Sequence, residues 1–277
     1  MTLAFGDIAV ILGYIGIVLF IGFYIARKKD KHTTTEEFIL AGRKVTLPLF
    51  VGTLVATWYG NILGIGEFIY EGGIVAWISF GLPYYFAASL FGIFIAKKIR
   101  TANTTTIPEQ ISNHYGNKAG FISSIIILLI TIPAAYILML GVILQMFISI
   151  SLVNAVILGA VISLAYLFTG GFNADVLTNS AQFVVMYLGF GALLFFSIEN
   201  LGSIPFMMES LPDKHLTILG GNTWQYVLSW YIIAFQTFVD PSFHQRCAAA
   251  KTPKTAQRGI FISIMFWMVF DFLTLFT

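Results

Sequence analysis

Residues 51–66 read VGTLVATWYGNILGIG, an apolar stretch in which a small side chain recurs at every fourth position. The small residues are Gly52, Ala56, Gly60 and Gly64, so they lie on one face of a helix. Such a face lets membrane helices pack closely. It also suits a helix that unwinds within the membrane and offers backbone carbonyls to a cation. The sequence leaves both interpretations open, although four residues at the same depth exceed what packing requires: Thr57, Trp58, Tyr59 and Asn61.

The composition around this stretch is that of a membrane protein. Hydrophobic residues make up 58% of the 277 residues and charged residues 10%, whereas a soluble domain carries about 25% charged residues. Most of the chain is therefore expected to face a lipid bilayer. The net charge of +2 gives no reason to expect a nucleic-acid partner. The sequence places no paired carboxylates and no nucleophile–base set at one depth, so it does not indicate an enzyme.

Eight apolar stretches reach or approach the roughly 20 residues that a helix needs to cross a bilayer. They are residues 8–26, 47–66, 74–96, 121–148, 153–169, 181–198, 224–244 and 259–277. The polar residues Ser149, Ser151 and Asn154 separate the fourth stretch from the fifth. Continuous apolar runs argue against a barrel, which needs alternation. The sequence thus predicts an all-α polytopic membrane protein with a single transmembrane domain over residues 1–277.

Lysine and arginine lie almost entirely on one side of these stretches. Of the 15 Lys and Arg residues, all except Lys214 fall between stretches one and two, three and four, or seven and eight. The positive-inside rule makes these connections cytoplasmic. We therefore expect a multi-pass protein of the plasma (inner) membrane with its N-terminus outside.

Two carboxylates lie at membrane depth. Asp240 precedes Pro241, whose ring frees the carbonyl of Thr237 and favours a helix break. Asp240 is a candidate functional group, or it pairs with Arg246 or a neighbouring loop as part of the structure. Asp271 lies about 20 Å into the eighth stretch by helical rise. An ionisable group at that depth is a functional candidate because its burial is costly, and the sequence offers Asp271 no evident partner.

Four short motifs resemble those of the sodium:solute symporter family. They are EFILAGR at 37–43; TIPE at 106–109 with YG at 115–116; GGFNAD at 170–175 with Thr178 and Gln182; and QR at 245–246 with AAAK at 248–251, Ala256 and Gly259. They occur in the family's order, and each lies on the predicted cytoplasmic side. The resemblance extends from about residue 5 to residue 277.

The resemblance implies a secondary transporter built from an inverted repeat of two five-helix units. Residues 8–26 would form an extra first helix, 47–198 the first repeat and 224–277 the start of the second. The implied function is sodium-coupled symport of a small organic solute, without an organic cofactor. Sodium would be held by backbone carbonyls of the second stretch, at Leu54, Val55, Ala56 and Thr57. Gly60 and Asn61 would line the adjacent solute space.

Three further residues with polar tips lie at membrane depth and are candidates for the same lining: Tyr136, Trp230 and Gln236. Side chains of this kind more often form hydrogen bonds between helices than contacts with a ligand. The sequence therefore leaves a structural role open for each of them.

Two features depart from the family pattern. Members with a second sodium site carry Asp directly after the threonine of the third motif, where this chain has Asn179. Neutral Asn is a poorer ligand for a hard cation, so we expect one sodium. The chain also ends at Thr277, within the eighth apolar stretch. We therefore expect an N-terminal portion whose missing helices come from elsewhere, for instance from a partner chain; a symporter-like sensor domain and a non-functional truncated product are the alternatives.

Overall fold

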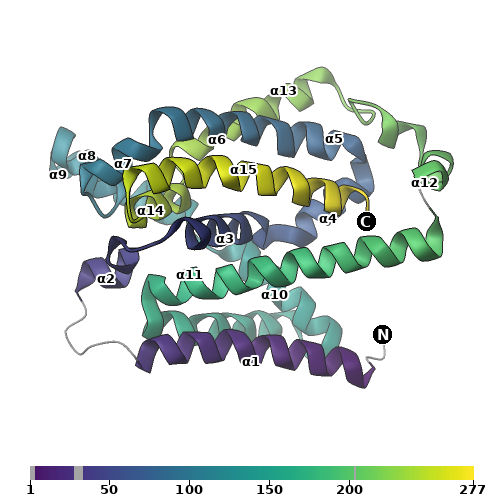
Figure 1. The fold of residues 1–277 in the computed structure, drawn as a ribbon, viewed down its shortest axis with the longest axis horizontal. Helices are drawn as coiled ribbons and strands as arrows, with labels where there is room; N and C mark the ends of the chain where they lie inside the picture. Colours follow the sequence, from purple (N-terminus) through teal and green to yellow (C-terminus); the bar gives the residue numbers. More distant parts are fainter. Residues whose placement is uncertain (1–3, 28–33, 203) are drawn as a thin grey trace.

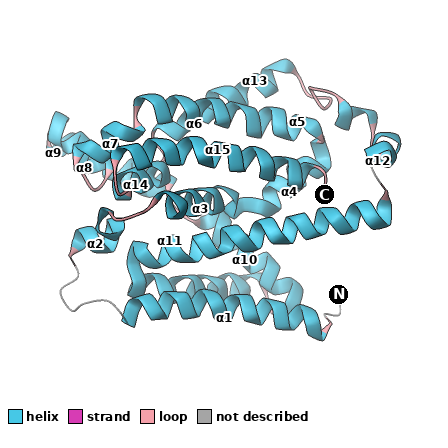
Figure 2. Cartoon of the chain, viewed as in Figure 1, coloured by secondary structure: helices cyan, strands magenta, loops and turns pink. Residues whose placement is uncertain are grey.

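The computed structural model describes residues 4–27, 34–202 and 204–277. Within these residues every regular element is a helix, and extended pairing is limited to one isolated bridge between Val45 and Ala250. Figure 2 shows these helices joined mostly by short loops. The all-α prediction is confirmed for this part of the chain. Lys28, Lys29 and Lys31, on which the orientation prediction partly depends, lie outside the described residues.

Most of the long helices run lengthwise through the molecule (Figure 1). The α-helices are α1 (Phe5–Arg27), α2 (Thr35–Leu40), α3 (Leu47–Trp58), α4 (Ile62–Gly72), α5 (Ile74–Ala76), α6 (Leu82–Phe94), α7 (Ala96–Ala102), α8 (Ile107–Tyr115), α9 (Asn117–Ile130), α10 (Ala134–Phe147), α11 (Leu152–Leu201), α12 (Ile204–Ser210), α13 (Trp224–Ile233), α14 (Pro241–Ala249) and α15 (Pro253–Leu275). Shorter helical turns are η1 (Ala41–Arg43), η2 (Tyr59–Asn61), η4 (Asp213–Leu216) and η5 (Ala234–Phe238), all 3₁₀, and the π-helical η3 (Trp77–Gly81).

Six helical segments in the described chain are long and apolar enough to cross a membrane. They are Phe5–Gly22, Leu47–Gly72, Ile74–Phe94, Asn117–Phe147, Gly170–Leu201 and Pro253–Leu275. The expected stretch 153–169 overlaps a shorter apolar helix, Leu152–Leu164. The expected stretch 224–244 is divided among α13, η5 and α14, so it contains no single helix of that length.

A sharp turn at Gly171 replaces the loop that the sequence predicts between residues 169 and 181. Gly171 has φ +61° and ψ −157°, a conformation that residues with a Cβ rarely adopt. One residue is therefore enough to turn the chain, and helix continues on both sides. The next membrane-spanning segment begins at Gly170, so the predicted start at Ala181 was wrong.

The four loop motifs meet at one end of the molecule, around α2, α7, α8 and α14 (Figure 1). Arg43, in the first motif, donates hydrogen bonds to the carbonyl of Asn103, just before the second motif, at 3.0 Å, and to that of Ala248, in the fourth, at 3.3 Å. Gly171, in the third, lies against Phe38. The start of α1 and the end of α15 lie at the opposite end of the molecule (Figure 1). The loops that the sequence assigns to the cytoplasm are thus on one side.

The second motif forms the start of α8. The hydroxyl of Thr106 accepts a hydrogen bond from the backbone N–H of Glu109 at 3.2 Å and so caps the helix. In return, the hydroxyl and the backbone N–H of Thr105 donate to the Glu109 carboxylate. These hydrogen bonds favour the ionised carboxylate and hold the pKa of Glu109 below its usual value. Helix capping therefore accounts for this TIPE motif.

Helix α3 lies between α11 and α15 (Figure 1), and glycines permit both contacts. A Cβ on Gly52 would lie 3.2 Å from Cα of Ser180 on α11. A Cβ on Gly259, in α15, would lie 2.2 Å from Cδ1 of Phe50. Close helix–helix packing, one of the two interpretations of the small-residue face, therefore applies at Gly52.

Replacing Gly171 with alanine is expected to destabilise the protein by at least about 1 kcal/mol, because the positive φ is unfavourable for a residue with a Cβ. The new Cβ would also lie 2.8 Å from the carbonyl oxygen of Phe38. Thermal unfolding in detergent micelles measures the change. Gly189→Ala is the matched control, since Gly189 lies in the same helix and has no atom within 4 Å of an added Cβ. An equal melting temperature for the two variants would contradict this account of the turn.

Candidate functional site

The second apolar stretch is interrupted at η2, Tyr59–Asn61, between α3 and α4. Asn61 has φ −101° and ψ 45°, outside helical geometry. The backbone N–H of Tyr59 donates to the carbonyls of Val55 and Thr57. The helix that the sequence marks by its glycine spacing is therefore broken, as the second interpretation of that spacing requires.

The residues predicted to offer carbonyls to sodium lie at the end of α3, directly before this break: Leu54, Val55, Ala56 and Thr57. The carbonyls of Val55 and Thr57 accept the Tyr59 N–H, and each carbonyl oxygen has a second lone pair that can contact a cation. The side chains of Leu54 and Val55 are buried, so protein surrounds this turn. The end of α3 thus presents backbone carbonyls in an environment shielded from lipid.

A buried arginine contacts the same end of α3. One terminal nitrogen of Arg246, on α14, donates to the hydroxyls of Thr53 at 3.1 Å and Thr57 at 2.5 Å. The carboxylate of Asp175 lies 3.5 Å from that nitrogen, and the two side chains are 4% and 28% exposed. The direct ion pair is therefore with Asp175, whereas the sequence suggested Asp240. Sequence reasoning missed this contact, although both partners lie in motifs that it identified.

Asn179 of α11 faces the same two hydroxyls. Its side-chain nitrogen donates to Thr53 at 3.2 Å and to Thr57 at 3.3 Å. These two hydroxyls therefore accept hydrogen bonds from both Asn179 and Arg246.

The seventh apolar stretch is also broken. Helix α13 passes into the 3₁₀ turn η5, and α14 begins at Pro241. Asp240 is the N-cap of α14: its carboxylate accepts hydrogen bonds from the backbone N–H of Ser242 at 2.7 Å and from its hydroxyl at 2.5 Å. The break that the Asp–Pro pair predicts is thus confirmed.

Aromatic side chains connect the two breaks. The Trp58 ring, directly before η2, packs against Tyr84 with ring centroids 4.7 Å apart. Gln236, in η5, donates to the hydroxyl of Tyr84 at 3.2 Å. Trp230 of α13 lies 5.9 Å from Phe80, which also stacks on Trp58. The predicted lining residues Trp230 and Gln236 are therefore joined to the second stretch through α6 and η3.

Gly60 and Tyr136 lie together on the other side of the break. A Cβ on Gly60 would be 2.9 Å from Cε1 of Tyr136, on α10. The exposed side chain of Asn61 lies over Gly64, in the first turn of α4. The structure thus gathers most of the predicted lining residues around the two breaks.

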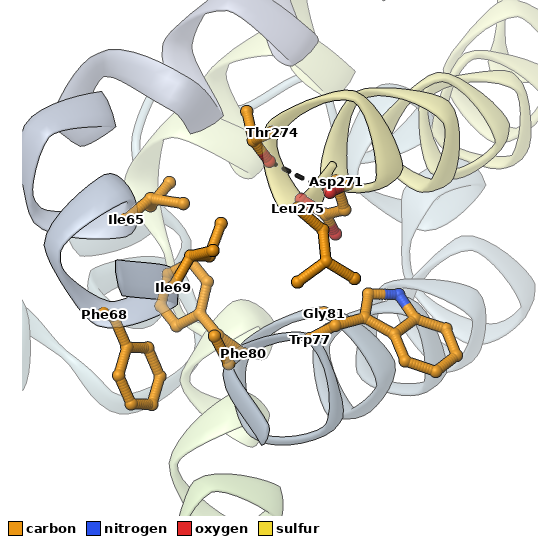
Figure 3. Close-up of a pocket in the computed structure, with 10 residues that line it drawn as sticks. Ile65, Phe68, Ile69, Trp77, Phe80, Gly81, Asp271, Thr274 and Leu275 are labelled. Atoms are coloured by element: carbon orange, nitrogen blue, oxygen red, sulfur yellow. Dashed lines mark hydrogen bonds between the residues drawn. The ribbon is translucent and has the colours of Figure 1, made fainter. Parts of the chain in front are cut away.

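Asp271 of α15 also contacts the break at η2, through Tyr59. Its carboxyl group is hydrogen-bonded to the hydroxyl of Tyr59, at 2.5 Å, and to the hydroxyl of Tyr85. It borders a cavity of ≈ 20 Å³, in which Figure 3 shows Asp271 and Thr274 of α15 facing Trp77 and Gly81 of η3. Its tyrosine partners come from segments far away in the sequence, which is why the sequence alone did not reveal them.

A second cavity, of ≈ 210 Å³, lies at the end of the molecule where the loop motifs meet. Helix α14 contributes His244 and Gln245 to its lining, and the second motif contributes Thr106 and Pro108. The cavity therefore adjoins the helix that follows the second break.

Residues 38–277 match the sodium:solute symporter family. The chain belongs to this family. Its relatives are transporters rather than enzymes. Together with the apolar helices, family membership makes this symporter-family chain a multi-pass membrane protein.

Two curated relatives illustrate the range of the family. The high-affinity choline transporter 1 of Drosophila melanogaster is 27% identical over 266 residues, which cover 91% of this chain and 41% of the relative. The sodium/pantothenate symporter of Haemophilus influenzae is 27% identical over 274 residues, covering 93% of this chain and 56% of the relative. This symporter-family chain thus spans about half the length of the curated relatives it matches.

The fold also matches a solved structure. A Na⁺-coupled sialic acid symporter, in a substrate-bound outward-open state, superimposes with a TM-score of 0.73 at 15% sequence identity. The match covers 99% of this chain and 59% of that protein. The Na⁺-coupled symporter fold is therefore present throughout the part of the chain that is compared.

Asp175→Asn is expected to cost about 1–3 kcal/mol of stability, because it leaves the buried Arg246 without its carboxylate. The range is below that of a fully buried pair, ~3–5 kcal/mol, since Asp175 is 28% exposed. Thermal unfolding measures the loss, with the exposed Asp213→Asn as control. If both variants unfold at the wild-type temperature, the ion pair does not stabilise the fold.

Proposed function

We propose that this chain forms the ion- and solute-binding part of a sodium-coupled symporter for a small organic solute. Residues 47–198 would be the first five-helix repeat, residues 224–277 would open the second in inverted orientation, and α1 would be the extra helix. The supporting observation is the pair of broken helices, with breaks at η2 and η5 that are linked through Tyr84. Broken helices at a repeat interface bind ions and substrate in secondary transporters.

Sodium is assigned to the backbone carbonyls at the end of α3, in the range 54–57. The hydroxyls of Thr53 and Thr57 already accept hydrogen bonds from Arg246 and Asn179. Carbonyls, which are good ligands for hard cations, are therefore the better candidates. Asn179 has a neutral amide where family members with a second sodium site carry a carboxylate, which favours a single sodium site here.

The solute is assigned to the space beside the two breaks. Gly60, Asn61 and Tyr136 would line it on one side of η2, and Trp230 and Gln236 on the side of α13 and η5. Gly60 keeps the backbone of η2 within reach of the Tyr136 ring. Solute and sodium would then share the same broken helix, which is a direct way to couple their binding.

An organic cation is the solute class that these side chains favour. Trp58 and Tyr84 offer aromatic faces, and Asp240 is the N-cap of α14 at the second break. Aromatic faces attract quaternary ammonium groups, and a carboxylate adds the opposite charge. Several relatives are choline transporters, so we take choline as the first solute to test.

Uptake into liposomes tests the proposal. The full-length protein is reconstituted, and uptake of labelled choline, pantothenate and glucose is measured with a sodium gradient and with potassium in place of sodium. Sodium-dependent uptake of choline supports symport of an organic cation. Uptake of one of the other solutes overturns the solute class but keeps symport. Binding without uptake favours the sensor alternative. If the protein neither binds nor takes up any of these solutes, the proposal is contradicted.

Gly60→Leu is expected to abolish sodium-dependent uptake while membrane insertion stays intact. A leucine side chain would enter the space held by Tyr136, whose Cε1 would lie 2.9 Å from the new Cβ. Gly66→Leu is the matched control, because Gly66 lies one helical segment later and an added Cβ there meets no atom within 4 Å. If Gly60→Leu takes up solute at the wild-type rate, η2 does not line the solute site.

A further inference from the structure

Asp271 connects three segments of the membrane domain. It lies on α15, and its two carboxylate oxygens contact Tyr59 in η2 and Tyr85 in α6. The hydroxyl of Tyr59 also lies 3.0 Å from the backbone carbonyl of Trp267, one turn earlier on α15. Tyr59 is the first residue of the break in the second stretch, so these hydrogen bonds hold the break against α15 and α6.

The three contacts need three protons. Each tyrosine hydroxyl supplies one proton, so Tyr59 and Tyr85 together supply two. If Asp271 is ionised, Tyr59 can donate either to Asp271 or to the Trp267 carbonyl, and one of its two oxygen–oxygen contacts lacks a proton. If Asp271 is a neutral acid, Tyr85 donates to one carboxyl oxygen, the other donates to Tyr59, and Tyr59 donates to Trp267. All three contacts are then hydrogen bonds.

The surrounding charges also favour a neutral Asp271. The two ion pairs in the described part of the chain involve Arg43 and Arg246. The titratable groups that act on Asp271 from the packed elements are tyrosines: Tyr59 of η2, Tyr85 of α6 and Tyr187 of α11. An ionised Asp271 would therefore carry an uncompensated negative charge within a membrane helix, which is costly.

The helix opposite Asp271 is irregular in a way that accommodates this group. Residues 77–81 form a π-helical turn, and such turns are frequent at functional sites. Gly81 in that turn lets the carboxyl approach, since a Cβ there would lie 2.9 Å from an Asp271 oxygen. The indole N–H of Trp77 is buried there, beside the same glycine. The adjoining cavity of ≈ 20 Å³ has room for about one water molecule.

We propose that Asp271, Tyr59 and Tyr85 form a proton-binding site, in which Asp271 is a neutral carboxylic acid whose proton fastens the break in the second stretch to α15. The ligand is a proton rather than sodium or the solute, and the site adjoins the proposed sodium position, because the Tyr59 N–H donates to the carbonyls of Val55 and Thr57. The assignment does not depend on transport. It concerns the charge state of one side chain, which can be observed directly.

Infrared spectroscopy of the purified full-length protein tests the site. A protonated carboxyl has a C=O stretch that the ionised carboxylate lacks, and we expect this band at neutral pH. Labelling aspartate with ¹³C at the side-chain carboxyl should shift the band without any mutation. Asp271→Asn should remove the band, and the control Asp240→Asn should leave it. Raising the pH should ionise Asp271 and remove the band in the wild type.

A further variant reports on the network itself. Tyr85→Phe removes the donor to the carbonyl oxygen of the neutral acid, so the C=O stretch should move to higher frequency while the band persists. If the wild type lacks an aspartic-acid band at neutral pH, or if the band survives Asp271→Asn in folded protein, Asp271 is ionised and the proposal is overturned. Because the isotope shift needs no variant, a failure of Asp271→Asn to fold does not prevent a decision.

Discussion

A peptide group inside a bilayer has no water to bond with, so a helix can break there only where protein supplies new partners. The break at η2 is surrounded in this way. The Tyr59 hydroxyl donates to a backbone carbonyl of α15, and the Tyr59 N–H donates to carbonyls of α3. Tyr136 covers Gly60, and α11 and α15 enclose α3 (Figure 1). Most other features near the middle of the molecule follow from this need. They include the glycines that let α11 and α15 approach and the aromatic side chains that link η2 with the second break.

Two charged side chains lie beside the same break, and the structure accommodates them differently. Arg246 keeps its charge and is held by Asp175 and two threonine hydroxyls. Asp271 has tyrosine partners and, in our proposal, gives up its charge by holding a proton. One charge is thus paired and, in our proposal, the other is neutral.

Much of this arrangement could be predicted from the sequence. Apolar length predicted the six helical segments long enough to span a membrane, but also two stretches, 153–169 and 224–244, that hold no single helix of that length. The spacing of Gly52 to Gly64 pointed to the broken segment, and Asp240–Pro241 marked the second break. The turn at Gly171 was missed because a loop and a single glycine with positive φ look alike in sequence. The partners of Arg246 and Asp271 were missed because they come from other helices, and hydropathy says nothing about which helices pack together.

The central claim is that sodium binds at the broken second helix, and a reporter at the break tests it most directly. A ¹⁹F label on Asn61→Cys can be followed by NMR, since Asn61 is exposed and the native Cys247 is buried. We predict that sodium shifts the ¹⁹F resonance at constant ionic strength, that potassium does not, and that a label on the outward-facing Leu128→Cys responds to neither ion. An Asn61 reporter that is insensitive to sodium would contradict the account.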